Sequence, residues 1–250
     1  MSLVHRTVRD GVAVVELNDP ERRNVLSAAM VEELVAAVED VERDESAFAL
    51  VVTGAGSAFC AGAHRDDLAA AAGGRTDRLR EIYAGFLRVG RCALPTIAAV
   101  NGPAVGAGFN LALACDVRIA AEEAVFDSRF ARLGIHPGGG HTWMLDRAVG
   151  RQAAAALLLF GESLDGEAAV TAGLALRCVP RARLLDAALA LARGASGAPR
   201  AVLSTITASL REAAALPDLA SAVEVEFERQ VESLRAPGVT TRLGHRPTTS

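Results

Sequence analysis

The sequence lacks the cysteine and histidine spacings that mark metal sites and disulfide frameworks. Its four cysteines stand far apart, at positions 60, 92, 115 and 178. A thiolate zinc site needs closely spaced pairs, and a disulfide framework is typical of small secreted chains. The five histidines show no metal-binding spacing either. We therefore expect no metal site, and thiols that are reduced and mostly buried.

The chain also lacks an excess of positive charge and a long apolar run. Its formal net charge of −4 argues against nucleic acid as the main partner, because phosphate binding needs a basic face. The longest fully apolar run, "AAAALLLF" at 153–160, is far too short to cross a bilayer. The opening "MSLVHRTVRD" has no cationic start followed by an apolar core, so no signal peptide is expected. These absences predict a cytoplasmic protein that binds neither nucleic acid nor membrane.

What the sequence does contain is the composition and the element order of an α/β protein. Hydrophobic residues make up 51% and charged residues 22%, which is typical of a folded globular chain. Two strands meet at Asp10-Gly11, a strong hairpin signal, and Ser27 can cap the amphipathic helix that follows. The fully apolar "AFALVVTG" is a strand of the kind buried between helices. Alternating strands and helices predict an α/β core over residues 1–195.

The pattern changes in residues 196–250. This region holds no strand pattern, and "AVLSTITASLREAAA" and "DLASAVEVEFERQVESLR" are amphipathic helices. An apolar stripe on a helical tail that cannot close its own core usually docks on the main domain or on another subunit. We therefore predict that residues 196–250 form a helical region that serves oligomerisation.

Two glycine-containing loops are the strongest functional signal. They are "FCAGAHRDDL" at 59–68 and "NGPAVGAGFNLALACD" at 101–116, and each follows an apolar strand. In the second, a strand over 96–100 is predicted to feed a tight loop over 101–106 and then a helix. The first turn of such a helix has unpaired N–H groups that bind and stabilise negative charge. Either loop alone also fits an ordinary tight turn, but together they indicate a site that holds an anion.

In these loops the sequence resembles the enoyl-CoA hydratase/isomerase family, the crotonase superfamily, and the resemblance runs from about Val12 to the end. It implies a crotonase-like spiral of repeated β-β-α units with a C-terminal helical trimerisation region that also closes the pocket. It implies a homotrimer or homohexamer that acts on an acyl-CoA thioester. Coenzyme A would be part of the substrate, and no tightly bound cofactor is expected.

The resemblance also assigns binding groups to positions of this chain. Its oxyanion hole would consist of two backbone N–H groups, those of Ala63 in "AGA" and Ala107 in "VGAG". The family's "RRNxL" stretch matches here and lies in relatives beside the nucleotide end of CoA. Arg22 or Arg23 could contact the CoA phosphates, with Ala61 in the same region. A plain charged surface loop is the alternative for this stretch.

The sequence departs from the family at the groups that move protons. Family hydratases use two glutamates, and the corresponding positions here are Asn110 and Phe130. An amide has no accessible basic form, and a phenyl ring has no proton to give. The family's usual aspartate after "AGx" is replaced by His64. Efficient hydration by the two-glutamate route is therefore not expected.

Other groups are candidates for acid–base work. His64 directly follows the first oxyanion residue, and His136 lies in "GIHPGGGH", in a loop that lines the acyl pocket in relatives. An imidazole is near its pKa at neutral pH. Asn110 could hydrogen-bond a substrate carbonyl or orient a water molecule without serving as a base. Structural or solvated roles are the alternative for both histidines.

Three further polar residues are given structural roles. Asp127 and Arg129, which flank Ser128, are expected to pair with each other, and His141 is expected at the start of a helix. Several functions remain open at this point. The chain could be a hydratase in the family sense, or an isomerase, decarboxylase or thioester hydrolase that uses His136 or His64. It could also bind acyl-CoA without catalysis.

Overall fold

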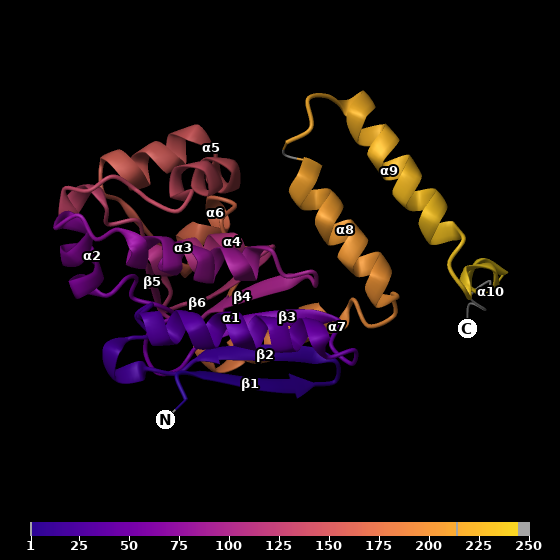
Figure 1. The fold of residues 1–250 in the computed structure, drawn as a ribbon, viewed down its shortest axis with the longest axis horizontal. Helices are drawn as coiled ribbons and strands as arrows, with labels where there is room; N and C mark the ends of the chain where they lie inside the picture. The colour runs from indigo at the N-terminus through magenta and orange to yellow at the C-terminus, as the bar shows by residue number, and fades with distance from the viewer. Residues whose placement is uncertain (1, 214, 245–250) are drawn as a thin grey trace. The chain divides into compact units, whose positions relative to one another are not determined.

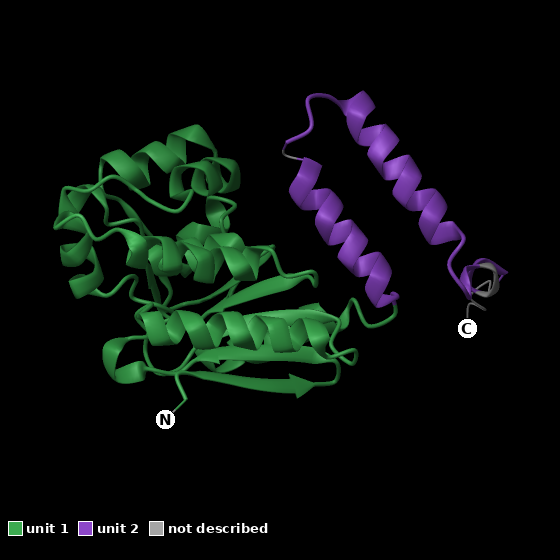
Figure 2. Ribbon diagram, viewed as in Figure 1, with its two compact units in different colours: residues 1–197 green, residues 198–250 purple. Residues whose placement is uncertain are grey.

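The computed structural model describes residues 2–213 and 215–244, which fall into two compact units, residues 1–197 and 198–250 (Figure 2). Every strand of the described chain lies in the first unit, where strands and helices alternate (Figure 1). The α/β class predicted from the sequence is confirmed. In the described chain, no helix combines the length and the apolar character that a membrane crossing needs.

The chain opens with a tight antiparallel hairpin of β1 (Val4–Arg9) and β2 (Val12–Leu17). Arg9 pairs with Val12, so only Asp10 and Gly11 form the turn, with φ angles of 51° and 75°. Positive φ at both central residues is the turn geometry that matches the twist of a two-residue hairpin. The hairpin predicted at Asp10-Gly11 is therefore confirmed.

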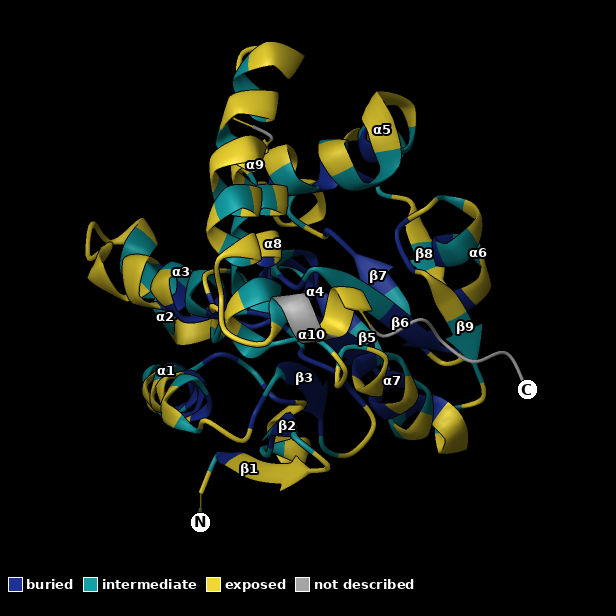
Figure 3. Cartoon of the chain, turned by 90° about the vertical axis from the view of Figure 1, so that its right-hand side faces the viewer, coloured by how far each residue is buried: buried dark blue, intermediate teal, exposed yellow. Residues whose placement is uncertain are grey.

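A six-stranded sheet forms the centre of the first unit. Its strand order is β1-β2-β3-β4-β6-β9, and every pairing after the hairpin is parallel. The strands that join the hairpin are β3 (Ala49–Gly54), β4 (Thr96–Val100), β6 (Val117–Ala121) and β9 (Arg177–Val179). All residues of β3 are buried, whereas the edge strand β1 is mostly exposed (Figure 3).

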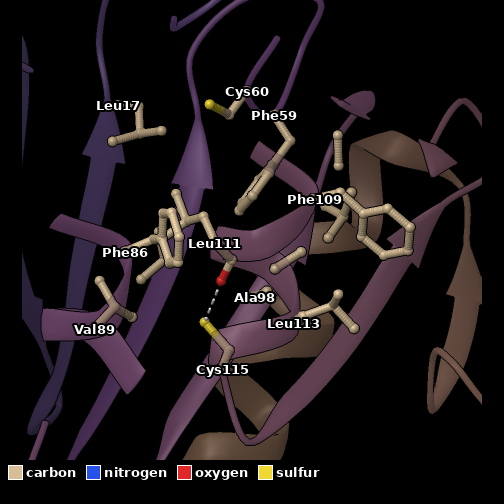
Figure 4. Close-up of a cluster of buried hydrophobic side chains, with 14 of the residues drawn as sticks. Leu17, Phe59, Cys60, Phe86, Val89, Ala98, Phe109, Leu111, Leu113 and Cys115 are labelled. Carbon is tan, nitrogen blue, oxygen red and sulfur yellow. Dashed lines mark hydrogen bonds between the residues drawn. The ribbon is translucent and has the colours of Figure 1, made fainter. Parts of the chain in front are cut away.

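Both faces of this sheet are buried, because successive residues of a strand point to opposite faces. On β2, Ala13 and Val15 belong to one hydrophobic core and Val12 and Val14 to the other. Helices α1 (Ala28–Arg43), α3 (Asp77–Gly90) and α4 (Ala107–Ala114) contribute to the first core, and α7 (Leu184–Arg193) to the second. Figure 4 shows side chains of α3 and α4 that meet in the first core.

Local sequence explains why α1 forms where it does. The backbone N–H of Met30 donates to the Ser27 side chain, which confirms the predicted cap and satisfies one free donor of the first turn. Met30, Leu34, Val38 and Val41 recur every three or four residues and are buried. This spacing places one apolar stripe of α1 against the sheet.

A second, three-stranded sheet includes part of the second glycine-containing loop. It consists of β5 (Pro103–Val105), β7 (Val125–Asp127) and β8 (Ser163–Asp165), and β5 pairs in parallel with β7. The prediction that 101–106 is only a tight loop was therefore wrong in part. Residues 103–105 adopt a strand conformation because they pair with β7, which lies more than 20 residues further along the chain. The loop predicted over 59–68 likewise ends in a helix, α2 (Arg65–Ala72).

The remaining elements of the first unit connect its strands and helices. Helix α5 (His141–Leu159) is interrupted at Gly150, whose φ of 75° is not helical. The other connecting elements are η1 (Pro20–Arg22), η2 (Ala131–Leu133), η3 (Arg181–Arg183) and α6 (Gly166–Thr171).

The second unit is helical, with α8 (Arg200–Ala213), α9 (Leu219–Leu234) and α10 (Val239–Gly244). Arg229 of α9 holds α8 by hydrogen bonds to Ser209 at 2.7 Å and to Glu212 at 2.5 Å. Apolar side chains of both helices line a cavity of about 710 Å³, among them Ile206, Leu210 and Phe227. These three are also largely exposed, so the unit leaves apolar surface uncovered.

Candidate functional site

The first glycine-containing loop is held in place by a buried asparagine. Asn24 is fully buried and has a φ of 56°. Its side-chain amide donates to the carbonyls of Ala55 and Ala58, both at 2.9 Å, and accepts from the N–H of Asp19. These hydrogen bonds satisfy the buried amide and join the "RRN" segment to the loop that leaves β3.

Residues 23–26 also form backbone hydrogen bonds to residues 61–62 of the first glycine-containing loop. The N–H of Ala61 donates to the carbonyl of Arg23, and the N–H of Leu26 donates to the carbonyl of Gly62 at 2.8 Å. Leu26 and Ala63 form an isolated parallel bridge. The backbone around Ala63 is therefore fixed by hydrogen bonds on the side of Leu26.

The two glycine-containing loops are in direct contact. The N–H of Cys60 donates to the carbonyl of Pro103, and the N–H of Val105 donates to the carbonyl of Cys60 at 3.0 Å. A Cβ at Gly108 would lie 2.1 Å from the Cys60 oxygen, and a Cβ at Gly62 would lie 2.8 Å from the Val105 oxygen. Both positions exclude any side chain, so the small residues are needed for this contact.

The contact brings together the two loops whose Ala63 and Ala107 N–H groups the sequence predicts as an oxyanion hole. Ala107 is the first residue of α4, and Gly106 before it has φ 52° and ψ −113°. A Cβ at Gly62, the neighbour of Ala63, would lie 3.7 Å from the Ala107 nitrogen. Within residues 2–213 and 215–244, neither the Ala63 nor the Ala107 N–H has a hydrogen-bond acceptor. The two donors are free to bind an anion at the positive end of α4.

Next to this pair lies a buried chain of three polar side chains. The amide nitrogen of Asn110 donates to the carbonyl of Gly138 at 3.0 Å, and its oxygen lies 2.5 Å from Nδ1 of His141. Nε2 of His141 lies 2.8 Å from the hydroxyl of Ser128. Asn110, Ser128 and His141 are each only 1% exposed. Helix α4, the residue after strand β7 and helix α5 thus meet at one hydrogen-bonded chain.

The partners fix the protonation of His141. A carbonyl only accepts, so the Asn110 nitrogen faces Gly138 and its oxygen faces the imidazole. Nδ1 must therefore carry the proton, and Nε2 accepts from the Ser128 hydroxyl. Burial lowers the pKa of His141 from 6.5 to about 4. The imidazole is neutral at physiological pH.

His141 lies between Asn110 and Phe130, the two positions at which the sequence is predicted to lack the carboxylates of the two-glutamate route. It bonds to Asn110 on one side, and its ring meets the Phe130 ring edge-on at 5.0 Å. It begins α5 as the sequence predicts, but its side chain points into the buried chain. Sequence reasoning missed this partnership, since Ser128 and His141 are 13 residues apart and no local pattern links them.

The two histidines that the sequence offers as acid–base candidates lie elsewhere. Nδ1 of His64 accepts from the N–H of Asp66 and caps α2. His136 is exposed, and its Nδ1 lies 2.7 Å from the Pro137 carbonyl. Neither forms a hydrogen bond to Asn110 in the described chain. A catalytic role for either stays a prediction.

The charged groups around the site fall into two sets. Arg22 and Arg23 are exposed beside the first loop, and the guanidinium of Arg22 lies 3.8 Å from Asp19. The predicted pair of Asp127 and Arg129 is confirmed at 2.8 Å. Among the described residues, no group of three side chains is placed to hold a metal ion.

Comparisons with known proteins show which family and fold this chain resembles. The family model for enoyl-CoA hydratase/isomerase matches residues 7–236. A probable enoyl-CoA hydratase of Mycobacterium tuberculosis is 49% identical over 238 residues, covering 93% of this chain and 92% of that protein. The 1,2-epoxyphenylacetyl-CoA isomerase of Escherichia coli is 36% identical over 85% of this chain and 83% of its own length. An enoyl-CoA hydratase structure from Bacillus anthracis has a TM-score of 0.89 at 29% identity, with 96% and 94% coverage.

The low pKa of His141 predicts how stability depends on pH. In the unfolded chain the imidazole regains its ordinary pKa and binds a proton first as the pH falls. The free energy of unfolding should therefore be unaffected by this group above pH 6.5 and should decrease as the pH falls from 6.5 to about 4. The decrease amounts to on the order of 3 kcal/mol. Urea unfolding across this range measures it.

A His141→Gln variant is the control for this measurement. It removes the titrating group while keeping a side chain that can hydrogen-bond, so its stability should vary less over the same pH range. Identical pH profiles for the two proteins would show that burial does not hold His141 neutral.

Proposed function

Since the chain belongs to the enoyl-CoA hydratase/isomerase family, as its sequence predicts, we propose that it binds an acyl-CoA thioester and stabilises the oxyanion or enolate formed from it. The backbone N–H groups of Ala63 and Ala107 would hold the thioester oxygen. The observation that supports this proposal is the direct contact of the two loops that carry these donors, neither of which has an acceptor in the described chain.

The physical advantage of this arrangement is electrostatic. As negative charge develops on the thioester oxygen, two preorganised N–H groups and the start of α4 meet it without reorganisation. Loss of one such donor typically raises the barrier by about 2.7–4 kcal/mol. A backbone donor cannot be removed by changing its own side chain, so the surrounding glycines, Gly62 and Gly108, are the positions through which the hole can be disrupted.

The side chains near the proposed oxyanion hole restrict which reactions the protein could catalyse. Asn110 directs both ends of its amide at protein groups, and Phe130 packs on His141, so neither supplies a carboxylate. Hydration by the two-glutamate route therefore has no support in this chain. Isomerisation, decarboxylation or hydrolysis with His136 or His64, and binding without catalysis, remain as alternatives within the family.

Arg22 and Arg23 are proposed to contact the phosphates of coenzyme A. Both are exposed, and the carbonyl of Arg23 accepts from the N–H of Ala61 in the first loop. A phosphate bound there would lie next to the oxyanion loop, where the "RRN" segment is fixed by Asn24. Coenzyme A would enter as part of the substrate and not as a resident cofactor.

Ligand binding is the most general expectation. Adding CoA or an acyl-CoA should raise the melting temperature in proportion to the logarithm of ligand concentration, because a ligand bound only by the folded state stabilises it. The double variant Arg22→Ala, Arg23→Ala should shift less. If saturating ligand leaves the melting temperature unchanged and calorimetry detects no binding, the proposed function is wrong.

Hydration is expected to be slow. Crotonyl-CoA hydration needs one group to activate water and another to deliver a proton, and each transfer is typically worth about 10²–10⁴ in rate. The protein should therefore hydrate crotonyl-CoA at least about 10²-fold more slowly than a two-glutamate hydratase, as followed by loss of enoyl absorbance. A comparable rate would mean that other groups do this work, and His136→Ala and His64→Ala would be the first variants to measure.

Assembly into a homotrimer or homohexamer is proposed from the second unit. Leu210 is 69% exposed and Phe227 is 60% exposed, an apolar surface that another copy of the chain would cover. Sedimentation should show an oligomer, and Leu210→Glu with Phe227→Glu should shift it toward monomer, while the exposed Glu228→Gln should not. A monomeric parent protein would refute the proposal.

A further inference from the structure

We propose that Ser128, His141 and Asn110 form a nucleophile, base and orienting group that together transfer the acyl group of a CoA thioester to the Ser128 hydroxyl and then to water. The inference rests on the proposed function, because it uses the same oxyanion donors. It assigns a reaction to side chains for which the hydratase mechanism has no role.

The first support is the order of the hydrogen bonds. Activation of a serine requires a base within hydrogen-bond reach of its hydroxyl and a third group that orients the base. The Ser128 hydroxyl lies 2.8 Å from Nε2 of His141, and Nδ1 of the same ring lies 2.5 Å from the Asn110 oxygen. Gly138 holds the other end of the Asn110 amide, which leaves the imidazole in the tautomer that accepts the serine proton.

The second support is the place of Ser128 beside the oxyanion donors. Val105 of β5 pairs with Asp127 of β7, and the N–H of Gly106 donates to the Asp127 carbonyl at 3.0 Å. Gly106 and Ser128 directly follow this last pair, and a Cβ at Gly106 would lie 4.0 Å from the Ser128 carbonyl oxygen. Ala107 is the next residue along the chain. Ser128 and Ala107 thus both lie just beyond the same end of the β5–β7 pairing.

The third support is the backbone at Ser128. The residue directly follows β7 and precedes η2 by three positions, and the following residue, Arg129, has a φ of 57°. Positive φ is unfavourable for a residue with a side chain and persists where the surroundings enforce it, often at functional sites. The pair of Arg129 with buried Asp127 holds this turn. The turn therefore fixes the backbone next to Ser128, at the point where the chain leaves the strand.

Access to Ser128 requires one side chain to move. Ser128 is almost fully buried, and the Phe130 ring lies edge-on against His141 at 5.0 Å. Phe130 is itself only half-buried, and one edge of its ring would lie 3.8 Å from a Cβ at Gly106. The ring therefore borders both the triad and the start of α4. Its displacement by an acyl chain uncovers the hydroxyl.

The reaction balances without a further reactant except water. The Ser128 oxygen bonds to the thioester carbon as its proton passes to Nε2 of His141, and the carbonyl oxygen becomes an oxyanion held by the two N–H groups. The C–S bond then breaks, and the proton on His141 goes to the CoA thiolate. Water next attacks the acyl-serine with His141 as base, which releases a carboxylic acid and restores the hydroxyl.

Thioesters without an alkene next to the carbonyl test the proposal, because they are not substrates for enoyl hydration. Butyryl-CoA and benzoyl-CoA should yield free CoA thiol, and mass spectrometry should find the acyl group on Ser128. Ser128→Ala and His141→Gln should lower thiol release by at least about 10²-fold. Ser163→Ala, an exposed serine of β8, is the matched control and should behave as the parent protein.

Two gain-of-rate variants separate catalysis from a structural role. Asn110→Asp places a carboxylate against Nδ1–H, which makes the imidazole a stronger base and should speed thiol release. Phe130→Ala should speed acylation by uncovering the hydroxyl. If the hydrogen-bonded side chains of Asn110, His141 and Ser128 only stabilise the fold, both changes should lower stability without increasing the rate of thiol release.

The outcomes are distinguishable from failure of the proposed function. If the thioesters raise the melting temperature but the parent protein and Phe130→Ala form no acyl-enzyme and release no thiol, the triad is refuted and acyl-CoA binding remains. Thiol release that Ser128→Ala leaves unchanged also refutes it. If the thioesters do not bind at all, the proposed function fails together with the triad.

Discussion

The pair of hydrogen bonds between Cys60 and β5 is the constraint on which the site depends. It joins the segment after β3 to the segment after β4, so two loops about 40 residues apart in sequence act as one. The contact is possible only because Gly62 and Gly108 have no side chains where the backbones meet. Since neither loop could hold both N–H groups alone, their docking creates the proposed oxyanion hole.

Burial governs the chemistry next to this contact. The polar chain of Asn110, His141 and Ser128 is shut off from water, so every member must be satisfied by another, and a charge there would be costly. The low pKa of His141 is the direct result. A neutral imidazole therefore lies between Asn110 and Phe130, which are uncharged side chains at the positions where the resemblance predicts two glutamates. On the proposed function, the two backbone donors would still stabilise negative charge, and the groups that transfer protons would differ.

The sequence predicts the parts of the structure that local physics determines. Asp10-Gly11 must form a tight turn, Ser27 caps a helix, and the two small-residue loops reveal the proposed site through their composition. The sequence does not predict strand β5, because this segment becomes a strand only through its pairing with the distant β7. The contact of Ser128 with His141 also could not be read from either residue's neighbours. Such features depend on long-range packing, which a periodicity or a motif does not encode.

The central claim is that Ala63 and Ala107 hold a thioester oxygen between them. Infrared spectroscopy of an acyl-CoA labelled with ¹³C at the carbonyl measures this directly, because hydrogen bonds to the oxygen weaken the C=O bond. The account predicts that, when the labelled thioester binds, the carbonyl stretch moves to a lower frequency than it has in water. A bound thioester whose carbonyl frequency equals that in water would contradict the account.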